Sequence, residues 1–360
     1  MFAFLLLVAG LIGVELTRRW LLQRPVPPPP SEPFAGVHYP VGSATVSERA
    51  TAAAPRATVI CMPGYCENVR YFTRAYADPD IQLILVSSAG YYTGLDGGQV
   101  QQAAWVHPPD APEGSIEYDA MVLNQALEHL PRSDRIRVHG HSRGGAVVLE
   151  AAARRPELFQ GVEVILEAPV LPQASLLLQP IPRFFYWLFP LLLPLWQAMP
   201  LPPVTLGRWG TLRDPRKREL IASFPFNARR GSILLANLRS VEAWMRNKPV
   251  QLYRHLDRGT ILIPEDDQVL DAASMARSAS HAEPRLTVVE VRGASHFILL
   301  DEPQSLPPLR AEGEADGGDE GALPQGVRKR LAKVTAKRRE AEARAKELEG
   351  EVARLRDRAE

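Results

Sequence analysis

Short apolar runs alternate with longer helical patterns along most of the chain. The apolar runs have the length of buried strands and lie at residues 58–62, 81–87, 136–138, 162–166, 259–264 and 285–291. The stretches that favour helices lie at residues 67–77, 116–130, 145–153 and 270–281. Residues 39–46 are expected to form a hairpin of edge strands around Gly42. Strands that alternate with helices predict an α/β fold, in which a mostly parallel sheet has helices on both faces.

The alternation is interrupted at residues 170–248, which we interpret as a helical cap inserted into the sheet domain. Its first part, residues 175–203, is the most apolar internal stretch, but repeated prolines and Arg183 exclude one continuous membrane helix. Some of its aromatic side chains are expected to fill the interface between cap and core. Others, with Trp187 and Phe189 as the candidates, are expected to form an apolar substrate-binding face.

The α/β pattern spans residues 37–300, and the chain continues beyond it at both ends. Residues 1–14 are apolar and basic residues follow, which predicts a membrane anchor at 1–24 with the remainder of the chain in the cytoplasm. A cleaved signal segment and a buried N-terminal helix are the alternatives. Residues 25–36 read as a proline-rich linker.

After residue 300 the composition changes to that of an appended segment. Residues 301–326 are acidic and rich in Gly and Pro, which predicts a flexible linker. Apolar residues at alternating spacings of four and three favour a coiled-coil-like helix at 327–360. Such a helix could pair with a second copy or a partner helix, lie on an anionic membrane, or stay solvated.

Composition excludes several other classes of protein. The net charge of +1 gives no sign of nucleic-acid binding. The two cysteines, Cys61 and Cys66, are too few for a disulfide framework, and their spacing matches no zinc motif. We therefore expect no metal and no cofactor, and a small-molecule substrate.

The candidate chemistry begins where the strand at 136–138 meets the helix at 145–153. The connection reads Gly-His-Ser-Arg-Gly over residues 140–144, which is a G-x-S-x-G pentapeptide. Between a strand and a helix, this motif holds the Ser on a sharp turn with an exposed hydroxyl. The helix that follows directs backbone N–H groups at the position of an oxyanion. The motif predicts Ser142 as a nucleophile, and a surface Ser on a Gly-rich turn is the alternative.

A Ser nucleophile needs a base, and the base needs an acid that orients it. His296 follows the strand at 285–291 and Asp267 follows the strand at 259–264, so both lie at carboxyl ends of the predicted sheet. We predict His296 as the base and Asp267 as the acid. Glu167, which follows the strand after Ser142, is the alternative acid.

Other residues near the motif receive smaller roles. The rings of His139 and His141 are expected to point away from the Ser142 hydroxyl and to pack at the strand end, and His281 is expected to be exposed. The backbone N–H groups of Tyr65 and Arg143 are the candidates for the oxyanion hole.

Together these motifs resemble those of an α/β-hydrolase-fold serine hydrolase of the lipase/esterase type, and the resemblance covers residues 37–300. The segments that carry it are Met62-Pro63-Gly64-Tyr65, Gly140-His141-Ser142-Arg143-Gly144-Gly145, Pro264-Glu265-Asp266-Asp267-Gln268-Val269 and Gly293-Ala294-Ser295-His296-Phe297. Two departures are Pro63, where family members often have His, and Pro264, where they often have Gly. Neither departure removes a triad member.

The resemblance implies a hydrolase that forms an acyl-enzyme on Ser142. We expect a membrane-associated carboxylic-ester hydrolase that acts on a lipophilic acyl substrate. A thioesterase, a peptidase or an acyltransferase would use the same triad. The alternative from another class is a membrane-tethered interaction protein built on an inactive hydrolase domain, and the intact triad argues against it.

Overall fold

The computed structural model describes residues 1–23, 30–51, 54–177, 214–222 and 231–309. Most of the apolar first part of the cap, including Trp187 and Phe189, lies outside the described residues. The predicted helix at 327–360 and most of the acidic linker before it also lie outside them.

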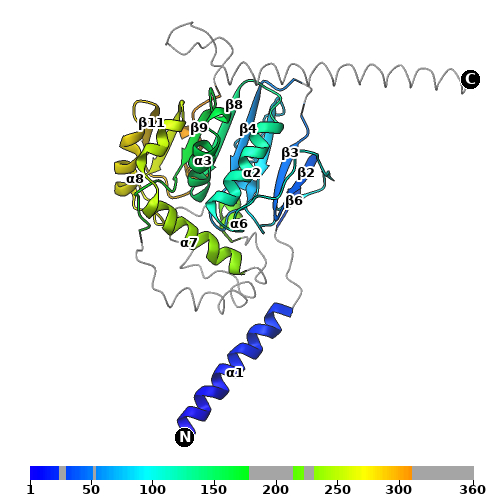
Figure 1. Cartoon of the computed structure of the whole chain (residues 1–360), viewed down its shortest axis with the longest axis vertical. Helices are drawn as coiled ribbons and strands as arrows, with labels where there is room; N and C mark the ends of the chain where they lie inside the picture. The colour runs from blue at the N-terminus through cyan, green and yellow to red at the C-terminus, as the bar shows by residue number, and fades with distance from the viewer. Residues whose placement is uncertain (24–29, 52–53, 178–213, 223–230, 310–360) are drawn as a thin grey trace, which may run out of the picture.

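A twisted sheet of nine strands forms the centre of the described chain (Figure 1). Its strands follow the order β11-β10-β9-β8-β4-β5-β3-β2-β7. Neighbouring strands are parallel, except that β3 runs antiparallel to both β2 and β5. The bounds are β2 (Gly36–Val41), β3 (Ala44–Arg49), β4 (Ala57–Met62), β5 (Ile81–Val86), β7 (Gln99–Val100), β8 (Ile136–His141), β9 (Glu163–Glu167), β10 (Arg258–Pro264) and β11 (Leu286–Val291). A separate two-stranded sheet pairs β1 (Glu32–Pro33) with β6 (Leu95–Asp96).

The strands predicted from the apolar runs are all present, which confirms the α/β fold with a mostly parallel sheet. The hairpin is present too, because β2 and β3 pair through a turn in which Gly42 has a φ of 61°. In β4, Ile60 and Met62 belong to one core cluster while Val59 and Cys61 belong to another. This period of two places a separate core on each face of the sheet, as expected for strands that are buried on both sides.

Helices cover the two faces and one end of the sheet. In Figure 1, α2 and α3 lie side by side on one face, while α6 and α7 lie below the sheet. The bounds are α1 (Phe2–Gln23), α2 (Ile116–His129), α3 (Arg143–Arg154), α6 (Pro215–Ala222), α7 (Gly231–Asn247), α8 (Ala272–Ala279) and α9 (Ile298–Asp301). Helices α6 and α7 belong to the region that we interpreted as the cap.

The predicted helix at 67–77 is wrong. The structure has only a short 3-10 helix, η1 (Val69–Tyr71), which begins after Asn68. The Asn68 side chain accepts a hydrogen bond from the N–H of Arg70 at 2.9 Å and favours a turn there. Val69, Tyr71, Phe72 and Tyr76 are all buried in the core cluster behind β4, so burial of these aromatic side chains overrides the local helical pattern.

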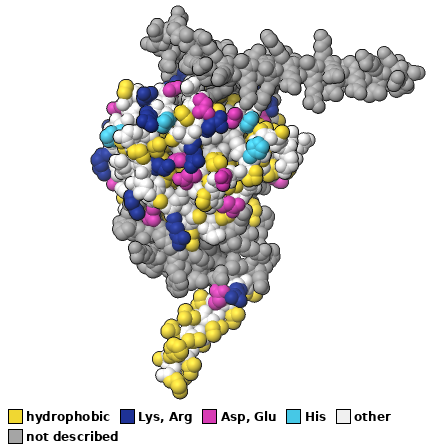
Figure 2. Space-filling model, in the orientation of Figure 1, with side chains coloured by type: hydrophobic (Ala, Val, Ile, Leu, Met, Phe, Trp, Pro, Cys, Tyr) yellow, Lys and Arg dark blue, Asp and Glu magenta, His cyan; other side chains and the backbone are white. Residues whose placement is uncertain are grey.

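Helix α1 projects away from the sheet domain, and apolar side chains cover its exposed surface (Figures 1 and 2). None of the helices in the described ranges combines the length and the apolar character that a membrane crossing requires. A transmembrane span at residues 1–24 is therefore not shown, and attachment of this segment to a membrane stays a prediction. The physical reason is that the apolar run is too short: residues 1–14 extend about 21 Å as a helix, against ~30 Å for the hydrocarbon core. Glu15 and Arg19 follow it and form an ion pair at 2.8 Å. The cytoplasmic location stays a prediction.

Candidate active site

Ser142 occupies a sharp turn between the last residue of β8 and the first residue of α3. Its backbone has a φ of 52° and a ψ of −119°, a conformation that residues other than Gly rarely adopt. The Ser142 N–H donates to the carbonyl oxygen of Glu167 at 2.9 Å, which ties the turn to the end of β9. A Cβ atom at Gly144 would lie 2.1 Å from the carbonyl oxygen of Met62, so only Gly permits this approach of α3 to β4. This is the geometry that the pentapeptide predicts.

The predicted base and acid lie in contact beyond the ends of β11 and β10. Nδ1 of His296 and Oδ2 of Asp267 are 2.8 Å apart, and both side chains are buried. The other oxygen of Asp267 accepts from the N–H groups of Val269 at 2.7 Å and Leu270 at 2.9 Å. Burial by itself raises the pKa of Asp267, but the charge and hydrogen bond of His296 and the two N–H donors outweigh it, so this pKa lies below its usual range. An ionised Asp267 holds a proton on Nδ1 of His296, so Nε2 is the ring nitrogen left to accept one.

The alternative acid, Glu167, is bound to a different set of partners. One oxygen accepts from the hydroxyl of Tyr71 and from the N–H of Leu299 at 2.8 Å. The other lies 3.0 Å from Nε2 of His139. Burial raises the pKa of Glu167, but the charges and hydrogen bonds of His141 and His139 bring it below the usual range. Glu167 is therefore an ionised anchor beneath the site, and it makes no hydrogen bond to His296.

The structure places the remaining histidines near their expected environments. His139 is buried, and its Nδ1 shares a hydrogen bond of 2.8 Å with the hydroxyl of Tyr76. Burial lowers the pKa of His139. His281 is exposed. His141 is buried, and its Nε2 lies 2.8 Å from the carbonyl oxygen of His296, which brings the base loop to the end of β8. Within the described residues, no hydrogen bond joins the Ser142 hydroxyl to the His296 ring; such contacts are often long without substrate and tighten when it binds.

The two candidate oxyanion donors lie on rigid supports beside Ser142. The Arg143 N–H is in the first turn of α3, where a helix has no acceptor of its own for it. The Arg143 side chain turns away into the core, where it pairs with Asp119 at 2.5 Å and is fully buried. Hydrogen bonds on both sides hold the turn that carries Tyr65. The backbone N–H of Gly64 donates to the Glu67 carboxylate, and the backbone N–H of Cys66 donates to the hydroxyl of Tyr91 at 3.1 Å.

Glu67 is the site residue that the sequence analysis missed. Its Oε2 lies 2.7 Å from Nδ1 of His141, in addition to its bond with Gly64. Burial alone would lower the pKa of His141. The charges of Glu67 and Glu167 and the hydrogen bonds of the ring outweigh this effect and raise the pKa to about 9. The His141 ring therefore carries two protons at neutral pH, which lets it donate to Glu67 and to the His296 carbonyl at once. The motif alone gives no signal for this pair, because Glu67 and His141 lie on different loops.

Replacing Glu67 with Gln is expected to move the alkaline limit of activity to lower pH. In the native protein, turnover should fall as the pH rises through about 9, because His141 then loses a proton and one of its two hydrogen bonds. Without the Glu67 carboxylate the pKa of His141 falls, so the same loss should begin at a lower pH. The measurement is kcat/KM against pH, with the exposed Glu290→Gln as the control. An unchanged alkaline limb in Glu67→Gln would show that His141 does not control it.

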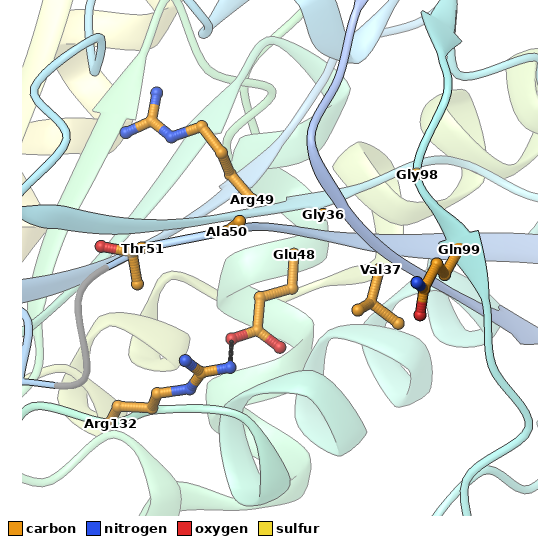
Figure 3. Close-up of a pocket in the computed structure, with 9 residues that line it drawn as sticks. All are labelled: Gly36, Val37, Glu48, Arg49, Ala50, Thr51, Gly98, Gln99 and Arg132. Atoms are coloured by element: carbon orange, nitrogen blue, oxygen red, sulfur yellow. Dashed lines mark ion pairs between the residues drawn. The ribbon is translucent and has the colours of Figure 1, made fainter.

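A hollow at the edge of the sheet is separate from these residues (Figure 3). It has a volume of about 560 Å³ and lies beside β2, β3 and β7, near the amino ends of the parallel strands. Its charged groups are engaged: Arg132 pairs with Glu48 at 2.6 Å, and Arg49 donates to the carbonyl oxygen of Asp78 at 2.7 Å. None of the predicted catalytic residues lines it. The candidate residues lie at the opposite, carboxyl end of the strands.

Residues 59–306 match a family model that is described as the alpha/beta hydrolase family. The chain belongs to this family. The matched region begins within β4, extends beyond β11 and includes the loops that carry Ser142, Asp267 and His296. The protein is therefore an α/β-hydrolase. No curated protein matches it at a significant level.

Solved structures share the fold of this α/β-hydrolase at low sequence identity. An N-formylmaleamic acid deformylase from Pseudomonas putida has a TM-score of 0.53 at 14% identity, over 75% of this chain and 97% of that one. An E-2-(acetamidomethylene)succinate hydrolase has a TM-score of 0.52 at 16% identity, over 76% and 96%. A lipase-esterase related protein from Clostridium acetobutylicum has a TM-score of 0.51 at 11% identity, over 73% and 96%. At these identities the likeness concerns the fold alone.

Proposed function

We propose that this α/β-hydrolase cleaves a carboxylic ester through an acyl-enzyme formed on Ser142. One observation carries the proposal: a Ser in a strained turn lies at the same end of the sheet as a His that is hydrogen-bonded to a buried, ionised Asp. This is the arrangement of groups that nucleophilic catalysis by a hydroxyl requires.

The proposed reaction proceeds in two halves. The Ser142 hydroxyl attacks the ester carbonyl and gives its proton to Nε2 of His296, while the N–H groups of Arg143 and Tyr65 bind the oxyanion. The C–O bond to the alcohol then breaks, and the His296 imidazolium protonates the departing oxygen. Water, deprotonated by the same nitrogen, attacks the carbonyl carbon of the acyl-enzyme. The bond between this carbon and Ser142 Oγ then breaks, the imidazolium returns the proton to Oγ, and the carboxylic acid leaves. Asp267 keeps its negative charge throughout and stabilises the imidazolium.

A lipophilic acyl group is the substrate that we favour. The support comes from the sequence, because residues 175–203 are strongly apolar and belong to the region that we interpret as the cap. Each methylene that an apolar pocket buries contributes about 0.8 kcal/mol. A thioesterase, a peptidase or an acyltransferase would use the same groups, and an inactive interaction protein would turn over none of these substrates.

A series of p-nitrophenyl esters from acetyl to palmitoyl tests this proposal. We expect kcat/KM to rise with chain length in the native protein, and the rise to be smaller in the double variant Trp187→Ser/Phe189→Ser. The ratio of kcat/KM between long and short esters is the decisive quantity, because it cancels general damage to the triad. A uniform loss across the series would indicate a small-ester hydrolase. Faster turnover of the matching thioesters or amides would change the substrate class, and no turnover of any of them would contradict the enzyme proposal.

A further inference from the structure

Helix α6, in the cap region, reaches the loop of the catalytic base through one buried lysine. Lys217 is fully buried, and its ammonium donates to the hydroxyl of Ser295 at 3.1 Å. The same ammonium pairs with the carboxylate of Asp301. Ser295 is the residue directly before His296, so this contact lies one residue from the proposed base.

Asp301 completes the attachment of Ser295. Its second oxygen accepts from the Ser295 N–H at 3.0 Å and from the Ser295 hydroxyl at 2.5 Å. Both the backbone and the side chain of Ser295 are therefore held by the Lys217–Asp301 pair. Together with the contacts of Asp267 and His141, this fixes the base loop from three sides.

The rest of α6 is attached to other parts of the protein. Arg216 pairs with Glu32 at 2.6 Å and donates to the carbonyl oxygen of Arg70 at 3.1 Å. Leu220 is buried in the core cluster behind β4. The neighbours Arg216 and Lys217 are thus both buried cations on one helix, and only Lys217 contacts the base loop.

A buried ion pair by itself adds little net stability to a fold. Removing two charges from water costs free energy that their attraction does not always recover, and apolar side chains of similar volume often serve as well. Arg216 and Leu220 already attach α6 to the domain. A charged side chain that is aimed at Ser295 is better explained by the orientation it imposes on the base loop.

We propose that Lys217, acting with Asp301, is a positioning residue for His296. It holds the backbone that carries the base, so the triad is competent only while Lys217 keeps its contacts with Ser295 and Asp301. This inference rests on the proposed function, because it assigns Lys217 a role in that same site. Positioning matters at this scale because a displacement of about 1 Å from a productive geometry can cost on the order of 10²-fold in rate.

The test uses three variants of the full chain. Lys217→Met removes the contact but leaves Asp301 buried without its partner. Lys217→Met/Asp301→Leu removes both charges, so it should keep the fold that the single variant could lose. Arg216→Met removes the neighbouring buried cation and leaves the base loop untouched. Each protein is measured for its melting temperature, its rate of labelling by a fluorophosphonate, and the downfield proton resonance of His296 Nδ1–H, assigned by its loss in His296→Ala.

We expect the double variant to melt close to the native protein and yet to label on the order of 10²-fold more slowly. Its His296 resonance should be broadened or absent, because the ring is no longer held against Asp267. Arg216→Met should keep the resonance and label at a rate similar to the native protein. Native labelling and an unchanged resonance in the double variant would overturn the proposal, as would an equal loss in Arg216→Met.

The two readouts separate this inference from the proposed function. Absence of labelling in the native protein would contradict a reactive Ser142, and with it the serine hydrolase mechanism. The His296 resonance reports on the position of the base without any turnover. If it is the same in the native protein and both Lys217 variants, the positioning role fails, whatever the activity.

Discussion

Replacing Ser142 with Ala is expected to abolish ester hydrolysis and fluorophosphonate labelling while the protein stays folded. Loss of the nucleophile of a triad costs on the order of 10⁶-fold in kcat. The variant removes a single oxygen that makes no hydrogen bond to another described residue, and Ala tolerates the positive φ about as well as Ser does. The free energy of unfolding should therefore change little. The measurement is the labelling rate beside the melting temperature.

The control for this variant is Ser133→Ala. Ser133 is also buried, but it lies before β8, at the opposite end of the sheet from the site. It should label at the native rate. Labelling of Ser142→Ala at the native rate would instead show that the reactive nucleophile is another residue.

Replacing Asp267 with Asn is expected to lower kcat on the order of 10⁴-fold. The amide can present an N–H to His296 Nδ1, which favours the wrong tautomer and places the ring proton on Nε2, where the base must accept one. The variant also removes the charge that stabilises the imidazolium. The measurement is the steady-state kcat on a single ester at a pH near neutrality.

Glu167→Gln provides the comparison, because Glu167 is a buried carboxylate at the same end of the sheet and is the alternative acid. Its partners are Tyr71, His139 and the N–H of Leu299, so its loss should act mainly on stability. A larger loss of kcat in Glu167→Gln than in Asp267→Asn would transfer the role of the acid to the end of β9.

The contacts of the site also explain how its charges are distributed. Two acidic residues of this region, Glu67 and Glu167, raise the pKa of the His141 ring, and Glu67 also contacts Nδ1 of that ring. In this buried setting each charge needs a partner, because an unpaired one carries the full cost of its desolvation. The His141 cation meets this need while it holds the His296 carbonyl. The base loop is thus held by two charged side chains that do not themselves react, His141 on β8 and Lys217 on α6.

The sequence by itself determined the strands of the sheet and the order of the candidate catalytic groups along the chain. The apolar runs predict the strands because a strand buried on both faces leaves a local signature of its own. The pentapeptide at 140–144 predicts the turn at Ser142 because Gly144 and the strand–helix change are local as well. Asp267 and His296 follow from a rule about where parallel strands end.

The tertiary structure alone decided which partner each buried charge took. Glu167 ends β9 and Asp267 follows β10, so both lie at carboxyl ends of parallel strands, and only packing gives His296 to Asp267 and His139 to Glu167. Glu67 meets His141, and Lys217 meets Ser295, across long separations in sequence. The wrong prediction of a helix at 67–77 has the same origin, since burial of Tyr71, Phe72 and Tyr76 outweighed the local helical pattern. These pairings leave no local periodicity, because each depends on two distant segments that the fold brings into one buried volume.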